Sequence, residues 1–105
     1  MIGRLRNRLG IYVPQTTPDA MGGATTQWVF YAHCWADVSP RSGGETQEHG
    51  RLAVTQSYRV IIRFREDFPE RARLMWKGRI LRVVTASDPD NRRERLHLIC
   101  EEEQQ

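Results

Sequence analysis

The sequence predicts an all-β fold, a small antiparallel β-barrel or sandwich of five to six strands that forms a single domain over residues 1–105. Apolar and polar residues alternate with a period of two in several separate segments, which is typical of strands with one buried face. No segment keeps the i, i+3, i+4 apolar spacing of a helix over three turns. Clusters of Gly, Pro, Asp and Asn separate these segments and are typical of turns. We therefore expect one small core enclosed by short strands.

The first two strands are predicted in the N-terminal part of the chain. Leu9, Ile11 and Val13 alternate before Pro14 and indicate the first strand. The second predicted strand is longer, and a bulge within it is compatible with the pattern. Six apolar residues of one parity mark its expected inner face: Trp28, Phe30, Ala32, Cys34, Ala36 and Val38.

The remaining strands are predicted in the second half of the chain. The apolar positions of the third strand are Tyr58, Val60, Ile62 and Phe64, with Arg59, Arg63 and Arg65 on its other face. Lys77-Gly78 is a two-residue hairpin turn, which joins a strand ending at Trp76 to one running from Ile80 to Thr85. After the turn SDPDNRRE, the last strand carries Leu96, Leu98 and Cys100.

The segments between and beyond these strands are predicted to be irregular. We expect a flexible N-terminal arm over residues 1–8, a long loop over residues 39–56 and a fraying acidic tail over residues 101–105. A second long connection is expected over residues 14–26. A short helix within residues 44–54 is the alternative for part of the long loop, although glycine is unfavourable in helices.

Charge and composition restrict the class of protein. The net charge of +3 permits a nucleic-acid or acidic protein partner without requiring one. No apolar run approaches the roughly 20 residues of a membrane-spanning helix, and the basic start has no apolar segment after it, so we expect neither a membrane partner nor a secretory signal. With only two cysteines, a disulfide scaffold is not expected, which favours reduced thiols and a cytosolic setting.

The sequence contains no pattern typical of a catalytic or metal site. It lacks a Gly-x-Ser-x-Gly elbow, a Gly-rich phosphate loop and a His-Glu-x-x-His motif. Cys34 and Cys100 lie on the apolar parity of their strands, where a thiol is unreactive, whereas His33 and His97 lie on the opposite parity. We therefore expect no enzyme activity, no catalytic residue, no metal and no cofactor.

Exposed charged and aromatic residues are the remaining candidates. The arginines of the third strand fit a solvated exterior, a protein contact or a nucleic-acid contact, and Trp35 lies on the polar parity of its strand. The N-terminal arginines could reach acidic residues of an adjacent copy. The expected contact residues between subunits are Arg4, Arg6, Arg8, Trp35, Arg59, Arg63, Arg65, Glu101 and Glu102.

Five motifs follow one another with defined spacing from Gly3 to Cys100, before an acidic end, and together with that end they cover the chain from Gly3 to Glu102. They are GRLRNRLGIYVP, the tryptophan at 28, CWADVSPRSGGE, SYRVIIRFRED and RLMWKGRILRVVTASDPDNRRERLHLIC. Each motif alone is a plain strand–turn signature, and the specificity lies in their order. In this order the sequence resembles the phage head–tail joining proteins, also called head-closure or stopper proteins, of long-tailed phages and gene-transfer particles.

The resemblance implies a small β-barrel that assembles in the bacterial cytoplasm into a ring, commonly of about twelve copies, in the neck of a virion or phage-like particle. Such a ring joins the portal or its adaptor above to the tail or tail terminator below, closes the DNA channel and can contact the end of the packaged DNA. The long loop would then point into the channel. Its expected gating residues are Arg41, Ser42, Gly43, Gly44, Glu45, Gln47, Glu48, His49, Gly50 and Arg51.

Two other functions stay open. Portal adaptors and tail terminators are also small ring proteins of the same stack. A nucleic-acid-binding small barrel is a further alternative, and it predicts an affinity that falls steeply with salt.

Overall fold

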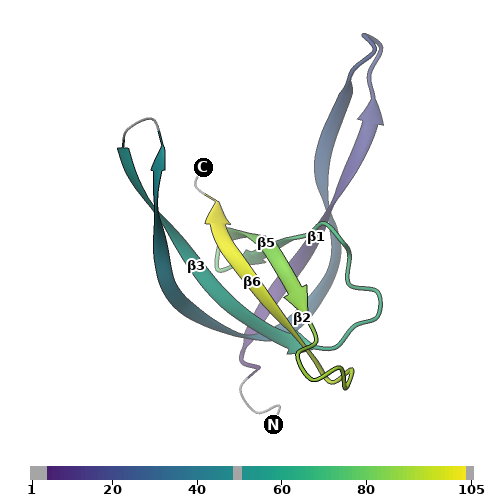
Figure 1. Ribbon diagram of the computed structural model, residues 1–105. Coiled ribbons are helices and arrows are strands. Elements are labelled where there is room, and N and C mark those ends of the chain that lie inside the picture. The colour runs from purple at the N-terminus through teal and green to yellow at the C-terminus, as the bar shows by residue number, and fades with distance from the viewer. Residues whose placement is uncertain (1–4, 49–50, 104–105) are drawn as a thin grey trace.

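Six antiparallel strands form one sheet that closes into a barrel in the computed structural model of the protein (Figure 1). The structure describes residues 5–48 and 51–103, with the backbone alone for residues 42–48 and 51–55. The strands are β1 (Asn7–Pro18), β2 (Ala24–Glu48), β3 (Arg51–Arg63), β4 (Arg73–Trp76), β5 (Arg79–Ser87) and β6 (Arg95–Glu103). Their order around the barrel is β1-β2-β3-β6-β5-β4, and β4 pairs with β1 to close it. The all-β prediction is confirmed, and the described residues contain no helix that could span a membrane.

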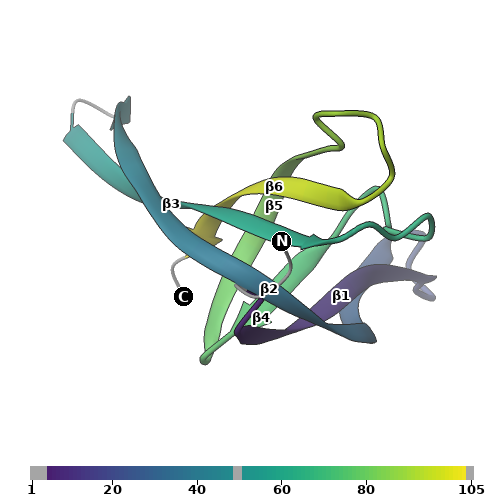
Figure 2. The ribbon, with the colours of Figure 1, turned by 90° about the horizontal axis from the view of Figure 1, so that it is seen from below.

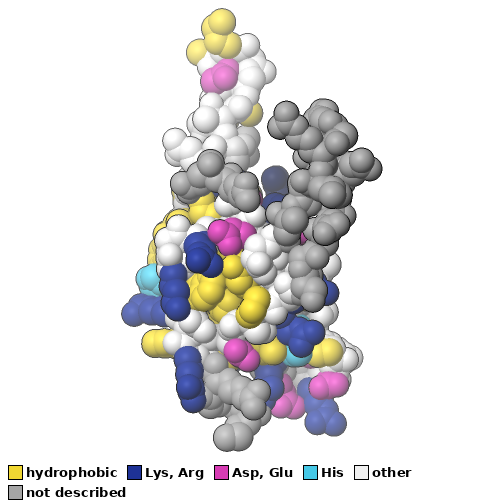
Figure 3. Space-filling model, turned by 90° about the vertical axis from the view of Figure 1, so that its left-hand side faces the viewer, with side chains coloured by type: hydrophobic (Ala, Val, Ile, Leu, Met, Phe, Trp, Pro, Cys, Tyr) yellow, Lys and Arg dark blue, Asp and Glu magenta, His cyan; other side chains and the backbone are white. Residues whose placement is uncertain are grey.

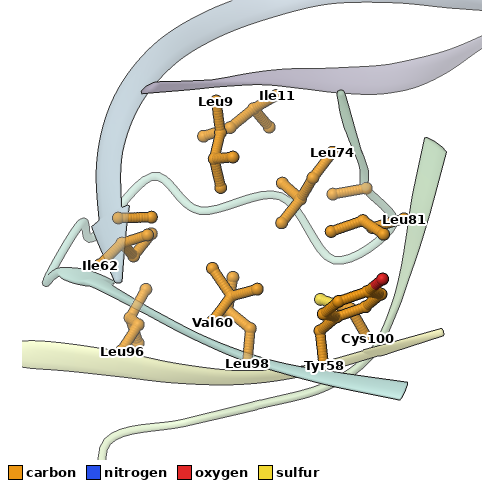
Figure 4. Close-up of a cluster of buried hydrophobic side chains, with 12 residues drawn as sticks. Leu9, Ile11, Tyr58, Val60, Ile62, Leu74, Leu81, Leu96, Leu98 and Cys100 are labelled. Carbon is orange, nitrogen blue, oxygen red and sulfur yellow. The ribbon is translucent and has the colours of Figure 1, made fainter. Parts of the chain in front are cut away.

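The core fills the barrel with side chains from all six strands (Figure 4). Its members are Leu9, Ile11, Ala36, Tyr58, Val60, Ile62, Ala72, Leu74, Leu81, Leu96, Leu98 and Cys100. The alternation predicted for the third and last strands is confirmed, because Val60, Ile62 and Leu98 are buried while Arg59 and Arg63 are exposed. Burial of one such aliphatic side chain contributes about 1.5–3 kcal/mol, so this layer is the main source of stability.

The inner face of β2 is shorter than predicted because of a bulge. Ile11 of β1 pairs with Ala32 and Tyr12 pairs with Phe30, so Tyr31 is an extra residue that reverses the parity of β2. Phe30 is 51% exposed in consequence, and Trp28 packs beneath the guanidinium of Arg73 outside the core. The prediction of an inward face is confirmed from Cys34 to Val38 and is wrong for Trp28 and Phe30.

Short turns join β4 to β5 and β5 to β6, at the positions where the sequence predicted turns. Lys77 and Gly78 have φ values of 50° and 76°, and two positive φ values in a two-residue loop define a type I′ turn. In the connection between β5 and β6, the Asp88 carboxylate accepts a hydrogen bond from the Arg93 backbone N–H at 2.8 Å. Both predicted turns are confirmed.

The two long connections expected from the sequence are strands for most of their length. Residues 14–18 and 24–26 belong to the β1–β2 ladder, and residues 39–48 and 51–56 belong to β2 and β3. The predicted loop over residues 39–56 and the alternative helix are therefore wrong, although residues 49 and 50 lie outside the described part. These strands lack alternation because they extend past the barrel, where no core lies beneath them to select one apolar face.

Both extensions leave the same end of the barrel and diverge from each other (Figures 1 and 2). We call residues 13–31 the first hairpin and residues 39–56 the second hairpin. The radius of gyration is 15.6 Å, with extents of 51 × 36 × 26 Å, whereas a compact chain of this length has a radius of about 13 Å. The hairpins account for this difference.

The chain ends are more ordered than predicted. Residues 7 and 8 belong to β1, and the Asn7 side-chain oxygen accepts a hydrogen bond from Trp76 Nε1 at 3.2 Å. Residues 101–103 belong to β6. The flexible arm and the fraying tail are thus wrong for these residues, and residues 1–4 and 104–105 lie outside the described part.

Candidate interaction surfaces

The second hairpin contains all the residues predicted to gate a channel. Its ladder pairs Arg41 with Ser57 and Gly44 with Thr55, and continues to Glu48, which pairs with Arg51. Ser42 and Gly43 lie where the register shifts between Arg41 and Gly44. Of the remaining predicted residues, Glu45 and Gln47 lie in β2, whereas His49 and Gly50 lie outside the described part. The described residues among those predicted to gate a channel therefore follow one two-stranded ribbon with an irregular register near its base.

The outer face of β3 is basic, as the sequence predicted. Arg59 and Arg63 are exposed on it, and Arg63 lies directly opposite Arg95 of β6. Two like charges opposite each other in a sheet repel. Among the side chains that the structure describes, no carboxylate forms an ion pair with Arg63 or Arg95. This face can therefore accept an anionic partner.

A second pair of opposed arginines, in contrast, is neutralised within the chain. Arg73 lies opposite Arg82 on β4 and β5. Glu103 pairs with Arg73 at 2.8 Å and Glu101 pairs with Arg82 at 2.5 Å. The predicted contact residue Glu101 is thus already engaged in its own subunit.

The acidic end of β6 also completes one end of the barrel. Glu102 accepts a hydrogen bond from the Tyr58 hydroxyl at 3.1 Å and lies 4.0 Å from the Arg79 guanidinium. The Tyr58 ring packs edge-on against Trp76. Glu102 therefore has partners in its own subunit too, whereas Arg6 and Arg8 are exposed and Arg4 lies outside the described part.

Aromatic side chains gather on the outer face of β2. Trp35 is 56% exposed, and the Phe30 ring lies 4.7 Å from the His33 ring, between centroids. Sequence reasoning placed Trp35 correctly on the outer face but missed Phe30. The signal for Phe30 was present, because residues 28–32 form an uninterrupted apolar run that breaks strict alternation.

Arg65 does not join the basic face of β3, because β3 ends at Arg63. Instead Arg65 forms two hydrogen bonds to Asp67, both 3.1 Å long, and its guanidinium lies over the Tyr31 ring at 5.9 Å. The Tyr31 hydroxyl donates to the Asp67 carboxylate at 3.0 Å and to its backbone carbonyl at 2.9 Å. This cluster fixes the loop after β3 against the bulge of β2.

Hydrogen bonds also set the acidities in this cluster. Donation from Arg65 and from Tyr31 lowers the pKa of Asp67 from 3.8 to about 2. The same bond to the Asp67 carboxylate raises the pKa of the Tyr31 hydroxyl. All three side chains therefore keep their charge states over the whole physiological pH range.

The two cysteines do not form a reactive site. Cys100 is fully buried, which raises its thiol pKa to about 12, and burial also raises the pKa of Cys34. The described residues contain no cluster of three or more His, Cys, Asp or Glu side chains that could hold a metal ion.

Comparison with known proteins assigns the chain to a family. The model of a family described as phage head completion protein matches residues 1–103. This chain belongs to the phage head completion protein family. The resemblance to phage head–tail joining proteins is thereby confirmed, and the family is one of structural proteins.

Individual relatives agree with this assignment over almost the whole chain. Head completion protein gp7 of Enterobacteria phage HK97 is 28% identical over 103 residues, which cover 93% of this chain and 92% of that protein. A chain from the virion of a native gene transfer agent particle has a TM-score of 0.76 at 21% identity, covering 94% of each chain. The solution structure of a Shigella flexneri 2a protein has a TM-score of 0.71 at 29% identity, covering 96% of this chain and 95% of the other. The barrel with its two hairpins is thus a fold that this head completion protein shares with other proteins.

Proposed function

We propose that this head completion protein is the ring subunit that joins the portal or adaptor of a phage-like particle to its tail and closes the DNA channel. Family membership supports the head-completion role. Closure of the DNA channel is inferred from the second hairpin, a ribbon that extends past the barrel through residues 39–48 and 51–56. Repeated around a ring of about twelve copies, such ribbons meet in the lumen.

The second hairpin is built to move as a unit. Continuous pairing from Ala36–Ile62 to Arg41–Ser57 anchors its base to the barrel. Beyond it, the register shift at residues 42–43 is a point where the ribbon can bend. Gly43 and Gly44 add backbone freedom there. A ribbon that bends at its base blocks the lumen in one position and clears it in another.

A shortened second hairpin tests this function. Residues 45–54 are replaced by Asn-Gly, which keeps the anchored ladder and supplies a two-residue hairpin turn. We expect the variant to fold and to join particles, but these particles should retain less than about a tenth of the packaged DNA before tail attachment. DNA protected from nuclease is measured per particle, and a stained gel measures incorporation of the variant. Sealed, tailed particles carrying the variant would contradict the proposal.

Contact with the end of the packaged DNA is a second candidate role, favoured by one observation. Arg63 and Arg95 face each other across β3 and β6 without a carboxylate partner among the described side chains. A backbone phosphate would relieve their repulsion. The two roles are compatible, because a ring that closes the channel lies beside the DNA end.

A further inference from the structure

The first hairpin projects into solvent with almost no charge. It leaves the barrel because β4 pairs with β1 only from Gly10 to Tyr12, and β3 pairs with β2 only from Ala36 onward. Although 28% of the chain is charged, Asp19 is the only charged residue between positions 9 and 32. An isolated two-stranded ribbon is marginally stable in water, so its surface is suited to being covered. The affinity of proteins for a nucleic-acid backbone depends mainly on Lys and Arg, which residues 9–32 lack, and this favours a protein as the covering partner.

The tip of the first hairpin presents one large apolar side chain, that of Met21, on a fixed turn. Met21 is 92% exposed, and the tip carries hydrophobic and acidic side chains (Figure 3). The Asp19 carboxylate accepts hydrogen bonds from the backbone N–H groups of Met21 and Gly23, both at 2.9 Å. The Asp19 N–H donates to the Gly23 carbonyl at 3.0 Å. A turn held in this way loses little conformational entropy when it binds.

An apolar groove of matching character lies on the outside of the barrel. It is about 150 Å³ in volume and is lined by Tyr12, Trp28, Arg73, Leu74, Met75 and Ile80. The guanidinium of Arg73 lies 4.3 Å from the Trp28 ring at the wall of the groove. Glu103 pairs with this guanidinium at 2.8 Å, and the five N–H groups of an arginine leave further donors beside that pair. The groove therefore combines an apolar interior with hydrogen-bond donors at its wall, as the tip combines a methionine with a carboxylate acceptor.

The tip cannot fill the groove of its own subunit. The groove reaches along the first hairpin as far as Trp28, which pairs with Pro14, and from Pro14 to Pro18 the β1 strand extends about 13 Å further before the turn begins. We propose that Met21 of one copy inserts into the groove of the next copy, with Asp19 near Arg73. The contact joins two different surfaces, and repetition of such a head-to-tail contact closes a ring. It rests on the proposed function as a ring subunit and names the contact between neighbours.

Disulfide trapping in assembled particles tests this contact. Met21→Cys is combined with Met75→Cys in the groove, and the matched control combines Met21→Cys with Val84→Cys, which is exposed outside the groove. After mild oxidation we expect a ladder of cross-linked multimers on a non-reducing gel for the first pair and none for the control. Wild-type particles measure the background from Cys34 and Cys100. Equal ladders in both pairs, no ladder, or a cross-link from residue 21 to a different protein would each overturn the inference.

Failure of the contact and failure of the proposed function give different results. Particles that contain the double variant without a ladder refute the contact alone. If the wild-type chain is not found in assembled particles, the proposed function is refuted. The contact is then tested by oxidising the purified double variant at high concentration, where a ladder of cross-linked multimers supports the contact and its absence refutes it.

Substitutions at the tip supply a second measurement. We expect Met21→Asp to lower the yield of tailed particles by about tenfold, because a second carboxylate cannot enter an apolar groove. Met21→Leu should stay near the wild-type yield. Equal yields for the two variants would speak against the groove as the binding site.

Discussion

At the level of single residues, Asp67 shows how an exposed carboxylate can join two segments that are distant in sequence. Its hydrogen bonds from Tyr31 and Arg65 connect the bulge of β2 to the loop after β3. The lowered pKa shows that the folded protein favours the ionised carboxylate. The stabilisation is therefore complete above the ordinary pKa of 3.8 and is lost as the pH falls through about 2.

The variant Asp67→Asn tests this linkage. At pH 7 we expect its melting temperature to lie a few degrees below that of the wild type, because Arg65 and Tyr31 lose a charged acceptor. As the pH falls from 4 to about 2, the difference in melting temperature should disappear, since the wild-type carboxyl becomes protonated and is then uncharged, like the amide of the variant. Thermal unfolding followed by circular dichroism at several pH values measures this difference. Asp90→Asn is the control, because Asp90 is also an exposed aspartate. A difference in melting temperature that does not depend on pH, or the same pH-dependent difference in Asp90→Asn, would contradict the role given to Asp67.

At the level of elements, the sequence predicted the strands that line the core and mistook the strands that leave it. Alternation located the third and last strands because Val60, Ile62 and Leu98 must be apolar while their neighbours face water. The two hairpins escaped prediction because a ribbon without a core has no face to keep apolar. Pro14 also suggested that β1 ends there. Proline is tolerated at this position because the pairing of β1 with β4 ends at Tyr12, so that this edge of β1 has no neighbouring strand beyond it.

The candidate surfaces were predictable to a similar degree. Parity alone placed Arg59, Arg63 and Trp35 on the exterior. It could not show that Arg65 turns toward Asp67, because that contact depends on where β3 ends. The sequence did not predict the groove, because the groove forms only where β4 closes the barrel. It did not predict the fixed tip either, because the tip depends on the hydrogen bonds of the Asp19 carboxylate within its turn.

The basic face of β3 gives a prediction about DNA. If phosphates bind there, the affinity of the assembled ring for duplex DNA should fall steeply as salt increases. Arg59→Ala combined with Arg63→Ala should reduce the slope of log K against log salt by about 2, since each phosphate contact contributes about 0.9. Arg82→Ala is the matched control, because this exposed arginine already pairs with Glu101. Fluorescence anisotropy over a salt series measures the slope, and identical slopes for all three proteins would exclude the contact.

At the level of the whole molecule, the barrel is closed by its shortest ladder. β1 pairs with β4 only at Gly10, Ile11 and Tyr12, whereas β3 and β6 pair continuously from Ser57 to Arg63. Less paired regions open at a lower free energy than the global unfolding of a protein. The seam between β1 and β4 also lies beneath the groove, which β1, β2, β4 and β5 line together. A partner seated in the groove would therefore hold the weakest part of the barrel shut.

Hydrogen exchange can measure this difference. In the isolated protein we expect peptides covering β4 (residues 73–76) to exchange at least about tenfold faster than peptides covering β6 (residues 95–103), because the seam opens without unfolding the rest of the barrel. In assembled particles the exchange of β4 should slow toward that of β6 as a neighbouring tip covers the seam. The variant Met21→Asp, assembled at whatever yield it allows, should keep the fast exchange of β4. Equal rates for β4 and β6 in the isolated protein would show that the barrel opens as one unit, and a fast β4 in wild-type particles would show that assembly leaves the seam uncovered.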